Sequence, residues 1–245
     1  MSEVLLKNIY LTYPIYGHKL SIKSKIAGVV GGGINTDKKK YHVEALKNLN
    51  CKFVNGEKIG LLGHNGAGKS TMLAMLSSIY PPSSGELTIN GKVQSLFNPG
   101  AGLEPEESGL RNIKRLGLLL NANINELEKN TDEIINVSGL GDYINLPVRS
   151  YSDGMKLRLC FSVITSWKSD IFLIDEFLSV GDNAFYKYCK GKLEEIMKSS
   201  SIVVLASHNL DFIKSFTSRV LVLKAGQIVF DGITSEGIKF YEEKY

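Results

Sequence analysis

The sequence predicts an α/β fold built on a largely parallel sheet, with a helical block inserted into it. Three observations support this prediction. The first is a set of unbroken apolar runs, typical of strands covered on both faces, at residues 58–62, 171–174, 202–206 and 220–223. The second is a glycine-rich segment placed between the first of these runs and a helix-compatible stretch. The third is the helical spacing of leucines and isoleucines between residues 104 and 167.

The first elements of the chain are expected to be two strands. Residues 4–13 are apolar and β-branched, and Pro14 is expected to end that strand. A second strand is expected at about 43–54, and the Asn55-Gly56 pair that follows it is a strong hairpin signal.

The glycine-rich segment fits the phosphate-binding pattern G-x-x-x-x-G-K-[ST] without a mismatch. Its glycines let several backbone N–H groups point at phosphate oxygens, and the dipole of the following helix favours the same anion. Lys69 is expected to reach the β- and γ-phosphates, while the Ser70 hydroxyl is expected to bind Mg²⁺. The segment therefore predicts binding of ATP or another nucleoside triphosphate with Mg²⁺, through Gly63, His64, Asn65, Gly66, Ala67, Gly68, Lys69, Ser70 and Thr71.

Two short strands are expected after the helix that follows this segment, at residues 87–89 and 93–96. The breaker Pro81-Pro82-Ser83-Ser84-Gly85 precedes them, and Asn90-Gly91 separates them. A last strand at 228–230 and a helix at 235–243 complete the expected elements.

The apolar run at 171–174 ends in two acids. Asp175 stands where a nucleotide-binding protein of this kind holds Mg²⁺, usually through water. Glu176 is expected to point off the strand end towards the γ-phosphate and to polarise the attacking water. The pair therefore predicts hydrolysis as well as binding.

Length and composition exclude several other classes of protein. With 245 residues, 22% of them charged, the chain is of ordinary globular composition and can bury a sizeable core. It has no apolar stretch as long as a membrane-spanning helix, and its first residues lack a signal-peptide pattern. Its three cysteines are far apart, which argues against a disulfide framework or a zinc site and suits a reducing cytoplasm.

The positive charge is concentrated in one segment. Residues about 15–41 interrupt the strand pattern with glycines and lysines and are interpreted as an insertion. Seven lysines lie between His18 and Lys47, against only two acids, Asp37 and Glu44. The segment is either a solvated loop or a surface that meets anionic lipid headgroups. It has few aromatic residues to alternate with its lysines, so nucleic acid is not an expected partner.

A further motif is informative because of its position in the chain. Tyr151-Ser152-Asp153-Gly154-Met155 opens a predicted helix, with Ser152 or Asp153 suited to the N-cap. Placed between the helical block and Asp175, it resembles the signature of the nucleotide-binding subunits of ABC transporters. Most members of that family have L-S-G-G-Q, of which this chain keeps the serine and the second glycine.

The resemblance covers nearly the whole chain and implies an architecture. This is a P-loop NTPase core of the ABC ATPase type, with an antiparallel β-subdomain and an inserted helical subdomain. The core is expected at 1–103 and 166–245, and the helical subdomain at about 104–165.

The resemblance also implies that two copies enclose ATP between them. Ser152 and Gly154 of one copy would then face the γ-phosphate held by the other. Asp182 occupies the place of the D-loop, a segment close to the second copy's nucleotide.

The same resemblance assigns three further roles. His208, after the strand at 202–206, corresponds to the switch histidine that contacts the γ-phosphate. Tyr13 is the first candidate for stacking on adenine, with Tyr41 and His42 as alternatives. Asn98 is the first candidate for the Q-loop position near the metal, with Gln94 as the alternative.

Details of these motifs resemble one subgroup, the ATPase subunits of bacterial polysaccharide exporters. They are Y-S-D-G-M at 151–155, D-E-x-L-x-V-G-D at 175–182 and the segment 98–106. The resemblance implies an ATPase at the cytoplasmic face of the bacterial inner membrane, bound to a separate integral membrane permease. The implied cargo is a lipid-linked glycan, with O-antigen first and teichoic acid or capsule as alternatives. An importer ATPase and a soluble, non-transport ABC ATPase are further alternatives.

Because the sequence ends at Tyr245, the chain is expected to lack the glycan-recognising C-terminal domain of some O-antigen ATPases.

Overall fold

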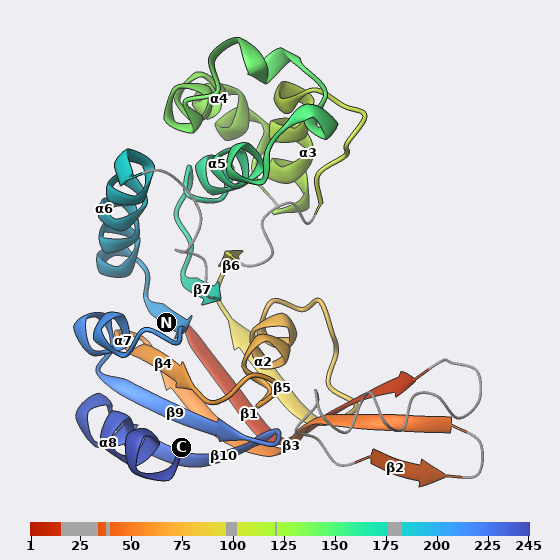
Figure 1. Ribbon diagram of the computed structural model, residues 1–245, viewed down its shortest axis with the longest axis vertical. Helices are drawn as coiled ribbons and strands as arrows, with labels where there is room; N and C mark the ends of the chain where they lie inside the picture. The colour runs from red at the N-terminus through yellow and green to blue at the C-terminus, as the bar shows by residue number, and fades with distance from the viewer. Residues whose placement is uncertain (16–33, 38–39, 97–101, 121, 176–182) are drawn as a thin grey trace.

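The computed structural model describes residues 1–15, 34–37, 40–96, 102–120, 122–175 and 183–245. Two sheets form the base of the molecule, and a group of helices projects from it (Figure 1). The predicted insertion at about 15–41 falls mainly outside these residues, as do Asn98, Glu176 and Asp182.

The first sheet is antiparallel and contains four strands in the order β2-β3-β1-β5. The long central pair, β1 and β3, runs in register from Glu3 opposite Val54 to Ile15 opposite Tyr41, with bulges. This sheet confirms the predicted antiparallel β-subdomain. Its strands are β1 (Glu3–Ile15), β2 (Ile34–Asp37), β3 (Lys40–Val54) and β5 (Ser84–Asn90).

The predicted end of the first strand at Pro14 is wrong. Strand β1 continues to Ile15, with Pro14 opposite His42 of β3. Within the described residues, β1 pairs with β5 only from Glu3 to Tyr10. After Thr12, whose N–H still donates to Ser83 Oγ, the described part of β1 makes no further backbone pairing on the β5 side, and a proline is tolerated at such an edge.

The predicted hairpin at Asn55-Gly56 is also wrong, although the turn itself is present. Gly56 has a φ of 95°, and the Glu57 N–H donates to the Val54 carbonyl over 3.1 Å. The next strand, β4 (Lys58–Leu62), joins the second sheet and does not pair with β3. A turn depends on its own few residues, whereas the sheet that β4 joins depends on where its buried residues 59–62 can be covered.

The second sheet has six strands in the order β10-β9-β4-β8-β7-β6. All neighbours are parallel except β9 and β10. Four of these strands coincide with the predicted unbroken apolar runs, which are buried because both faces of the sheet are covered. The strands after β4 are β6 (Val93–Leu96), β7 (Ile171–Asp175), β8 (Ile202–Ala206), β9 (Arg219–Lys224) and β10 (Gln227–Ile233).

Successive side chains of these strands point to opposite faces of the sheet, so alternate residues belong to two different hydrophobic clusters. Leu173 of β7 faces a cluster that contains β1, β3 and helix α2 (Lys69–Leu76). Its neighbour Phe172 faces the other cluster, which continues into the projecting helices. The remaining helices of the base are α6 (Asn183–Ser199), α7 (Leu210–Phe216) and α8 (Thr234–Lys244).

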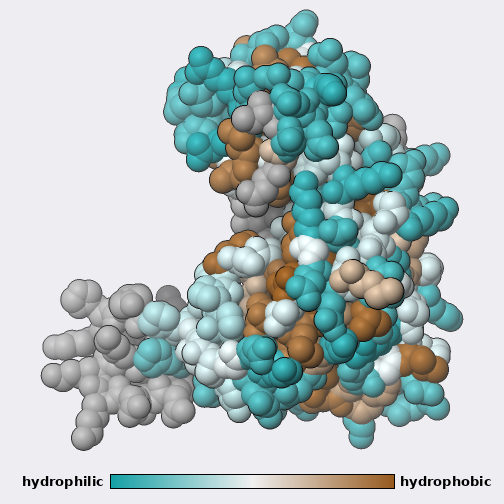
Figure 2. Space-filling view, turned by 180° about the vertical axis from the view of Figure 1, so that it is seen from behind, coloured by the Kyte–Doolittle hydropathy of each residue, from teal (hydrophilic) through white to brown (hydrophobic). Residues whose placement is uncertain are grey.

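The projecting helices are α3 (Gly109–Leu119), α4 (Ile124–Ser138) and α5 (Asp153–Ile164), with short 3-10 turns at Gly141–Asn145 and Val148–Ser150. Asn112, fully buried on α3, fastens the segment before the helix, because its amide bonds both backbone groups of Glu104 and the carbonyls of Glu107 and Ser108. On the face shown in Figure 2 this part is mainly hydrophilic. Over the described ranges, none of the helices has the length and hydrophobicity that crossing a bilayer requires.

Candidate nucleotide-binding site

Three parallel strands bring the predicted site residues to one edge of the second sheet. Strand β4 leads into the glycine-rich loop, β7 ends at Asp175, and β8 ends shortly before His208. In the register of the sheet, Ala206 of β8 lies between Leu61 of β4 and Asp175 of β7. The carboxyl ends of these strands therefore meet, which is where α/β sheets bind ligands.

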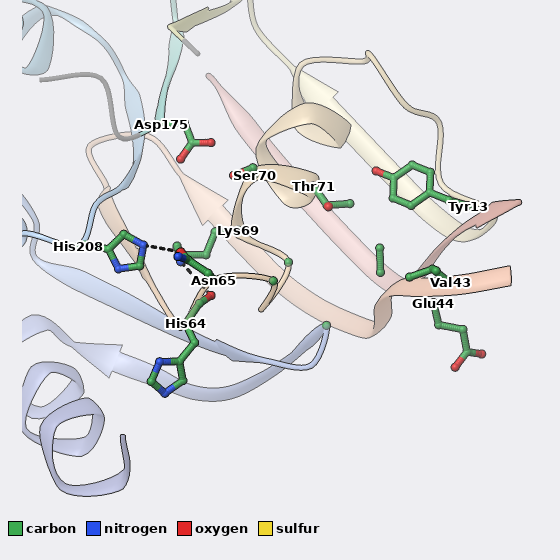
Figure 3. Close-up of a pocket in the computed structure, with 14 residues that line it drawn as sticks. Tyr13, Val43, Glu44, His64, Asn65, Lys69, Ser70, Thr71, Asp175 and His208 are labelled. Carbon is green, nitrogen blue, oxygen red and sulfur yellow. Dashed lines mark hydrogen bonds between the residues drawn. The ribbon is translucent and has the colours of Figure 1, made fainter. Parts of the chain in front are cut away.

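A cavity of about 440 Å³ opens at this edge (Figure 3). The sequence-predicted residues that line it come from the loop, from β1 and from the two neighbouring strand ends: Tyr13, His64, Asn65, Gly66, Gly68, Lys69, Ser70, Thr71, Asp175 and His208. The structure thus brings together residues that are widely separated along the chain.

Three glycines of the loop that follows β4 have a positive φ, namely Gly63, Gly66 and Gly68, and the first and last are the most constrained. Gly63 has a φ of 148°, and a Cβ there would lie 2.5 Å from the carbonyl oxygen of Leu223. Gly68 has a φ of 110° and immediately precedes α2, whose N-terminus faces the cavity. Both residues adopt a left-handed conformation that side chains disfavour. The fold therefore presents the N–H groups of a helix start to the cavity, an arrangement suited to an anion.

Lys69 is the cation of this site. The residue is only 8% exposed, and its ammonium donates to the carbonyls of Gly63 and His64. These bonds fold the side chain over its own loop and hold the charge beside the cavity. A compact ammonium in this place matches the predicted contact with the β- and γ-phosphates.

Ser70 and Asp175 present side-chain oxygens on one side of the cavity (Figure 3). Hydroxyl and carboxylate oxygens suit Mg²⁺, which commonly takes one or two protein ligands and completes its shell with phosphate and water. In the part of the chain that the structure describes, no three His, Cys, Asp or Glu side chains form a metal-binding group. The two side chains therefore suit a metal ion that is also bound by phosphate, and not a metal ion that the protein alone surrounds.

His208 reaches the cavity from the segment between β8 and α7. A hydrogen bond of 3.0 Å joins its Nε2 to Oδ1 of Asn65, so the imidazole donates to the glycine-rich loop. The neighbouring residues fix the backbone, because the Asn209 N–H donates to Ser207 Oγ and the Asn209 side chain caps α7. The predicted switch histidine is thereby connected to the phosphate loop.

Ser152 and Gly154 lie elsewhere, at the start of α5 in the helical part. Ser152 is exposed and is the N-cap, with its hydroxyl accepting from the Met155 N–H over 3.3 Å. The preceding Tyr151 is buried, and its hydroxyl donates to the Tyr143 carbonyl over 2.6 Å. Gly109 makes room for that hydroxyl, since a Cβ at Gly109 would approach it to 2.3 Å. The tyrosine of Y-S-D-G-M thus anchors the motif, while the serine faces outwards.

Four cavity residues were not predicted from the sequence, namely Val43, Glu44, Ala45 and Gly226. Gly226, in the turn between β9 and β10, joins the loop to β3. Its N–H donates to the Ala67 carbonyl over 3.0 Å, and its own carbonyl accepts from the Lys47 N–H over 2.8 Å. The Ala225-Gly226 pair between two predicted strands indicates a turn, but not the loop against which that turn packs.

Replacing Gly226 with alanine is expected to lower the free energy of unfolding by about 3 kcal/mol and to weaken ATP binding. Gly226 has a φ of 81°, and a Cβ there would lie 2.5 Å from the Ala45 carbonyl oxygen. A left-handed backbone costs alanine about 1 kcal/mol, and overpacking typically adds about 1–3 kcal/mol. Chemical denaturation and calorimetric titration with ATP measure the two effects.

Gly56→Ala is the matched control for this change. Gly56 has a similar φ, 95°, but a Cβ at this position would have open space around it, with no contact within 4 Å. The control should lose about 1 kcal/mol of stability and bind ATP like the wild type. Equal effects of the two substitutions would show that the turn between β9 and β10 does not support the loop.

Comparison with known proteins identifies the family. The sequence model of the ABC transporter family matches residues 46–179, which is more than half of the chain. The chain belongs to the ABC transporter family. The matched region contains the glycine-rich loop, the helical part, the signature motif and Asp175.

Curated relatives point to a subgroup of ABC proteins. The chain is 40% identical over 231 residues to the O-antigen export system ATP-binding protein RfbE of Yersinia enterocolitica, covering 93% of this chain and 97% of that protein. It is 41% identical over 199 residues to the teichoic acids export ATP-binding protein TagH of Shouchella clausii, covering 81% of this chain and 55% of that protein. It is 34% identical to the O-antigen export system ATP-binding protein RfbB of Myxococcus xanthus, covering 99% and 56%. The chain thus spans nearly all of the first relative and about half of the other two.

Solved ABC structures agree with the fold. One is a dimeric ATP-binding cassette in a post-hydrolysis state bound to ADP and phosphate, with a TM-score of 0.70, 22% identity and coverage of 94% of this chain and 98% of that one. Another is an ATP-binding subunit of an ABC transporter, with a TM-score of 0.72, 17% identity and coverage of 98% and 93%. The predicted family and fold class are confirmed, and the chain is an ABC ATPase.

Proposed function

We propose that this chain is the ATP-hydrolysing subunit of a bacterial exporter for lipid-linked polysaccharide, with O-antigen as the favoured cargo. The observation that carries the proposal is the meeting of Lys69, Asp175 and His208 at one cavity in an ABC chain that is 40% identical to an O-antigen export protein. A phosphate loop, a metal-binding carboxylate and a histidine at one sheet edge are the parts that ATP hydrolysis needs.

Within this proposal the roles of the site residues are distinct. The loop from Gly63 to Thr71 holds the phosphates, and Ser70 with Asp175 binds Mg²⁺, which neutralises charge on the phosphate oxygens. Glu176 polarises the attacking water, and His208 contacts the γ-phosphate. Asn98, from the segment before α3, contributes at the metal.

The proposed working unit is a pair of identical chains. Ser152 and Gly154 line no part of the cavity of their own chain, yet Ser152 is exposed at the start of α5. A helix N-terminus is suited to the γ-phosphate of a nucleotide bound to a second copy. Asp182 would lie at the same junction. ATP then joins the two copies, and hydrolysis removes that contact.

The proposed partner is an integral membrane permease, which this chain would contact from the cytoplasmic face of the inner membrane. The surface near residues 98–112 is the proposed docking site, and the structure describes its part from 102 to 112. Two exposed ion pairs lie there, Glu106 with Arg149 at 2.8 Å and Glu107 with Arg111 at 2.7 Å, and Leu110 is 40% exposed. Exposed pairs contribute little to folding, so these charges are available for a partner.

Teichoic acid is the second candidate cargo, favoured by the 41% identity to TagH of Shouchella clausii. O-antigen is placed first because the match to RfbE extends over 93% of this chain, against 81% for TagH. The two cargoes differ in their sugars and in the phosphate of the teichoic acid backbone, so chemical analysis separates them.

Deleting the gene for this chain is expected to remove one polysaccharide from the cell surface and to accumulate its lipid-linked form inside the cell. Extraction of the lipid-linked fraction, followed by sugar and phosphate analysis, identifies the cargo. Expression of the wild-type chain should restore export. Unchanged surface polysaccharide in cells that lack the protein would contradict the proposal.

A further inference from the structure

Thr71, within α2 (Lys69–Leu76), and Tyr80, which follows this helix in the sequence, lie near the ring of Tyr13. Burial raises the pKa of Tyr13, and the nearby side chain of Thr71, in the first turn of the helix, opposes that rise. Figure 3 shows the phenol oxygen pointing towards α2 and Thr71. Tyr80, which follows the C-terminal end of α2, contacts the ring edge-on, with centroids 5.1 Å apart and an interplanar angle of 78°.

The segment that carries Tyr80 is fastened to β1 beside Tyr13. The Ser83 N–H donates to the Tyr10 carbonyl over 2.8 Å, and the Thr12 N–H donates to Ser83 Oγ over 2.9 Å. The hydroxyls of Thr12 and Ser83 are a further 3.0 Å apart. Because these bonds end one residue before Tyr13 in β1, they fix the two tyrosines relative to each other.

The exposure of Tyr80 argues against a role in the core. The residue is 44% exposed and belongs to neither hydrophobic cluster, so little apolar area is gained by placing a large aromatic residue there. Its described ring contact is with Tyr13, in the geometry that aromatic pairs prefer. An edge-on neighbour restricts rotation of the Tyr13 ring and leaves that ring at the cavity.

We propose that Tyr80 is a positioning residue that orients Tyr13 for stacking on the purine base of the nucleotide. Tyr80 follows α2, and the phosphate loop precedes this helix, so α2 connects the base side of the site with the phosphate loop. The inference rests on the proposed function, since it takes ATP as the ligand of the cavity and Tyr13 as the stacking residue. It adds a determinant of base binding that lies outside the lining of the cavity.

The test compares two ligands that share phosphates but differ in the base. Binding of ATP and of inorganic tripolyphosphate, each with Mg²⁺, is measured by calorimetry on the purified chain. Tyr80→Ala should weaken ATP binding by about 2- to 10-fold, the range expected for one lost aromatic pair, and should leave tripolyphosphate binding within error of the wild type. Tyr80→Phe, which keeps the ring contact, should restore ATP affinity. Ile79→Ala, at an adjacent residue that is 54% exposed, is the matched control and should bind both ligands normally.

The outcomes separate this inference from the proposed function. Equal weakening of both ligands by Tyr80→Ala would overturn the inference, because Tyr80 would then support the phosphate loop in general. Unchanged ATP affinity in Tyr80→Ala, together with weakened affinity in Tyr13→Ala, would overturn the role of Tyr80 and leave the nucleotide site intact. A wild-type chain that binds tripolyphosphate no less tightly than ATP would overturn both, since no base would be recognised.

Discussion

Replacing Lys69 with methionine or alanine is expected to lower ATP hydrolysis by at least about 100-fold, the usual cost of removing one group that stabilises transition-state charge. Lys69 is 8% exposed, and its ammonium is held over the loop by the carbonyls of Gly63 and His64. A charge fixed in this way needs little rearrangement to meet the β- and γ-phosphates. Steady-state phosphate release and calorimetric ATP binding measure the loss.

The two substitutions separate charge from packing. Methionine keeps most of the buried volume of Lys69 without the charge, so its free energy of unfolding should stay close to that of the wild type. Alanine leaves a small cavity and should be less stable, yet equally inactive. Lys69→Arg should also fail, because a planar guanidinium cannot take the place of a compact ammonium between two loop carbonyls.

Lys239→Ala is the control for the change in net charge. Lys239 lies on α8, its side chain is 77% exposed, and its ion pair with Glu243 is long, at 3.8 Å. Such a pair contributes little, so both stability and ATP hydrolysis should be preserved. Normal ATP hydrolysis by Lys69→Met would remove the assignment of the phosphate site.

Features of this site that depend on neighbouring residues in the sequence could be predicted. The loop from Gly63 to Thr71 needs its glycines, lysine and serine at fixed offsets, so the pattern alone indicates a phosphate cradle. The four residues before Asp175 in β7 are apolar and buried, because β7 lies between two other parallel strands, and such an apolar run can be recognised in the sequence. Ser152 was recognisable as a cap because capping is local.

Features that depend on which segments meet in space could not be predicted. Pro14 breaks a strand in general, but here it lies beyond the residues that β5 pairs with. Asn55-Gly56 turns the chain, but the turn does not determine which sheet receives β4. The bond between Gly226 and Ala67 joins residues far apart in the sequence, and nothing in either segment alone indicates the other. The contact of Tyr80 with Tyr13 is of the same kind.

Replacing Glu176 with glutamine is expected to preserve ATP binding and to slow hydrolysis by about 100- to 10,000-fold, the usual range for loss of a general base. Glutamine has nearly the size of glutamate but cannot take a proton from water, while Lys69 can still meet the phosphates and Ser70 and Asp175 can still bind Mg²⁺. ATP should then remain bound between two copies of the chain. Light scattering with Mg-ATP should give twice the monomer mass, and the dimer should persist longer than that of the wild type.

Glu195→Gln is the control for this change. Glu195 is an exposed acid of α6 that pairs with Lys192, and its glutamine variant should hydrolyse ATP normally.

A second substitution tests which surface closes that dimer. Ser152→Asp keeps a good N-cap for α5, because aspartate caps helices as well as serine does. It also adds a negative charge where the γ-phosphate of the second copy would lie, and like charges repel across a desolvated contact. The chain that carries both Glu176→Gln and Ser152→Asp should therefore bind ATP and stay monomeric. If this double variant still dimerised with ATP, the contact between copies would not use the start of α5, and the proposed two-chain site would have to be abandoned.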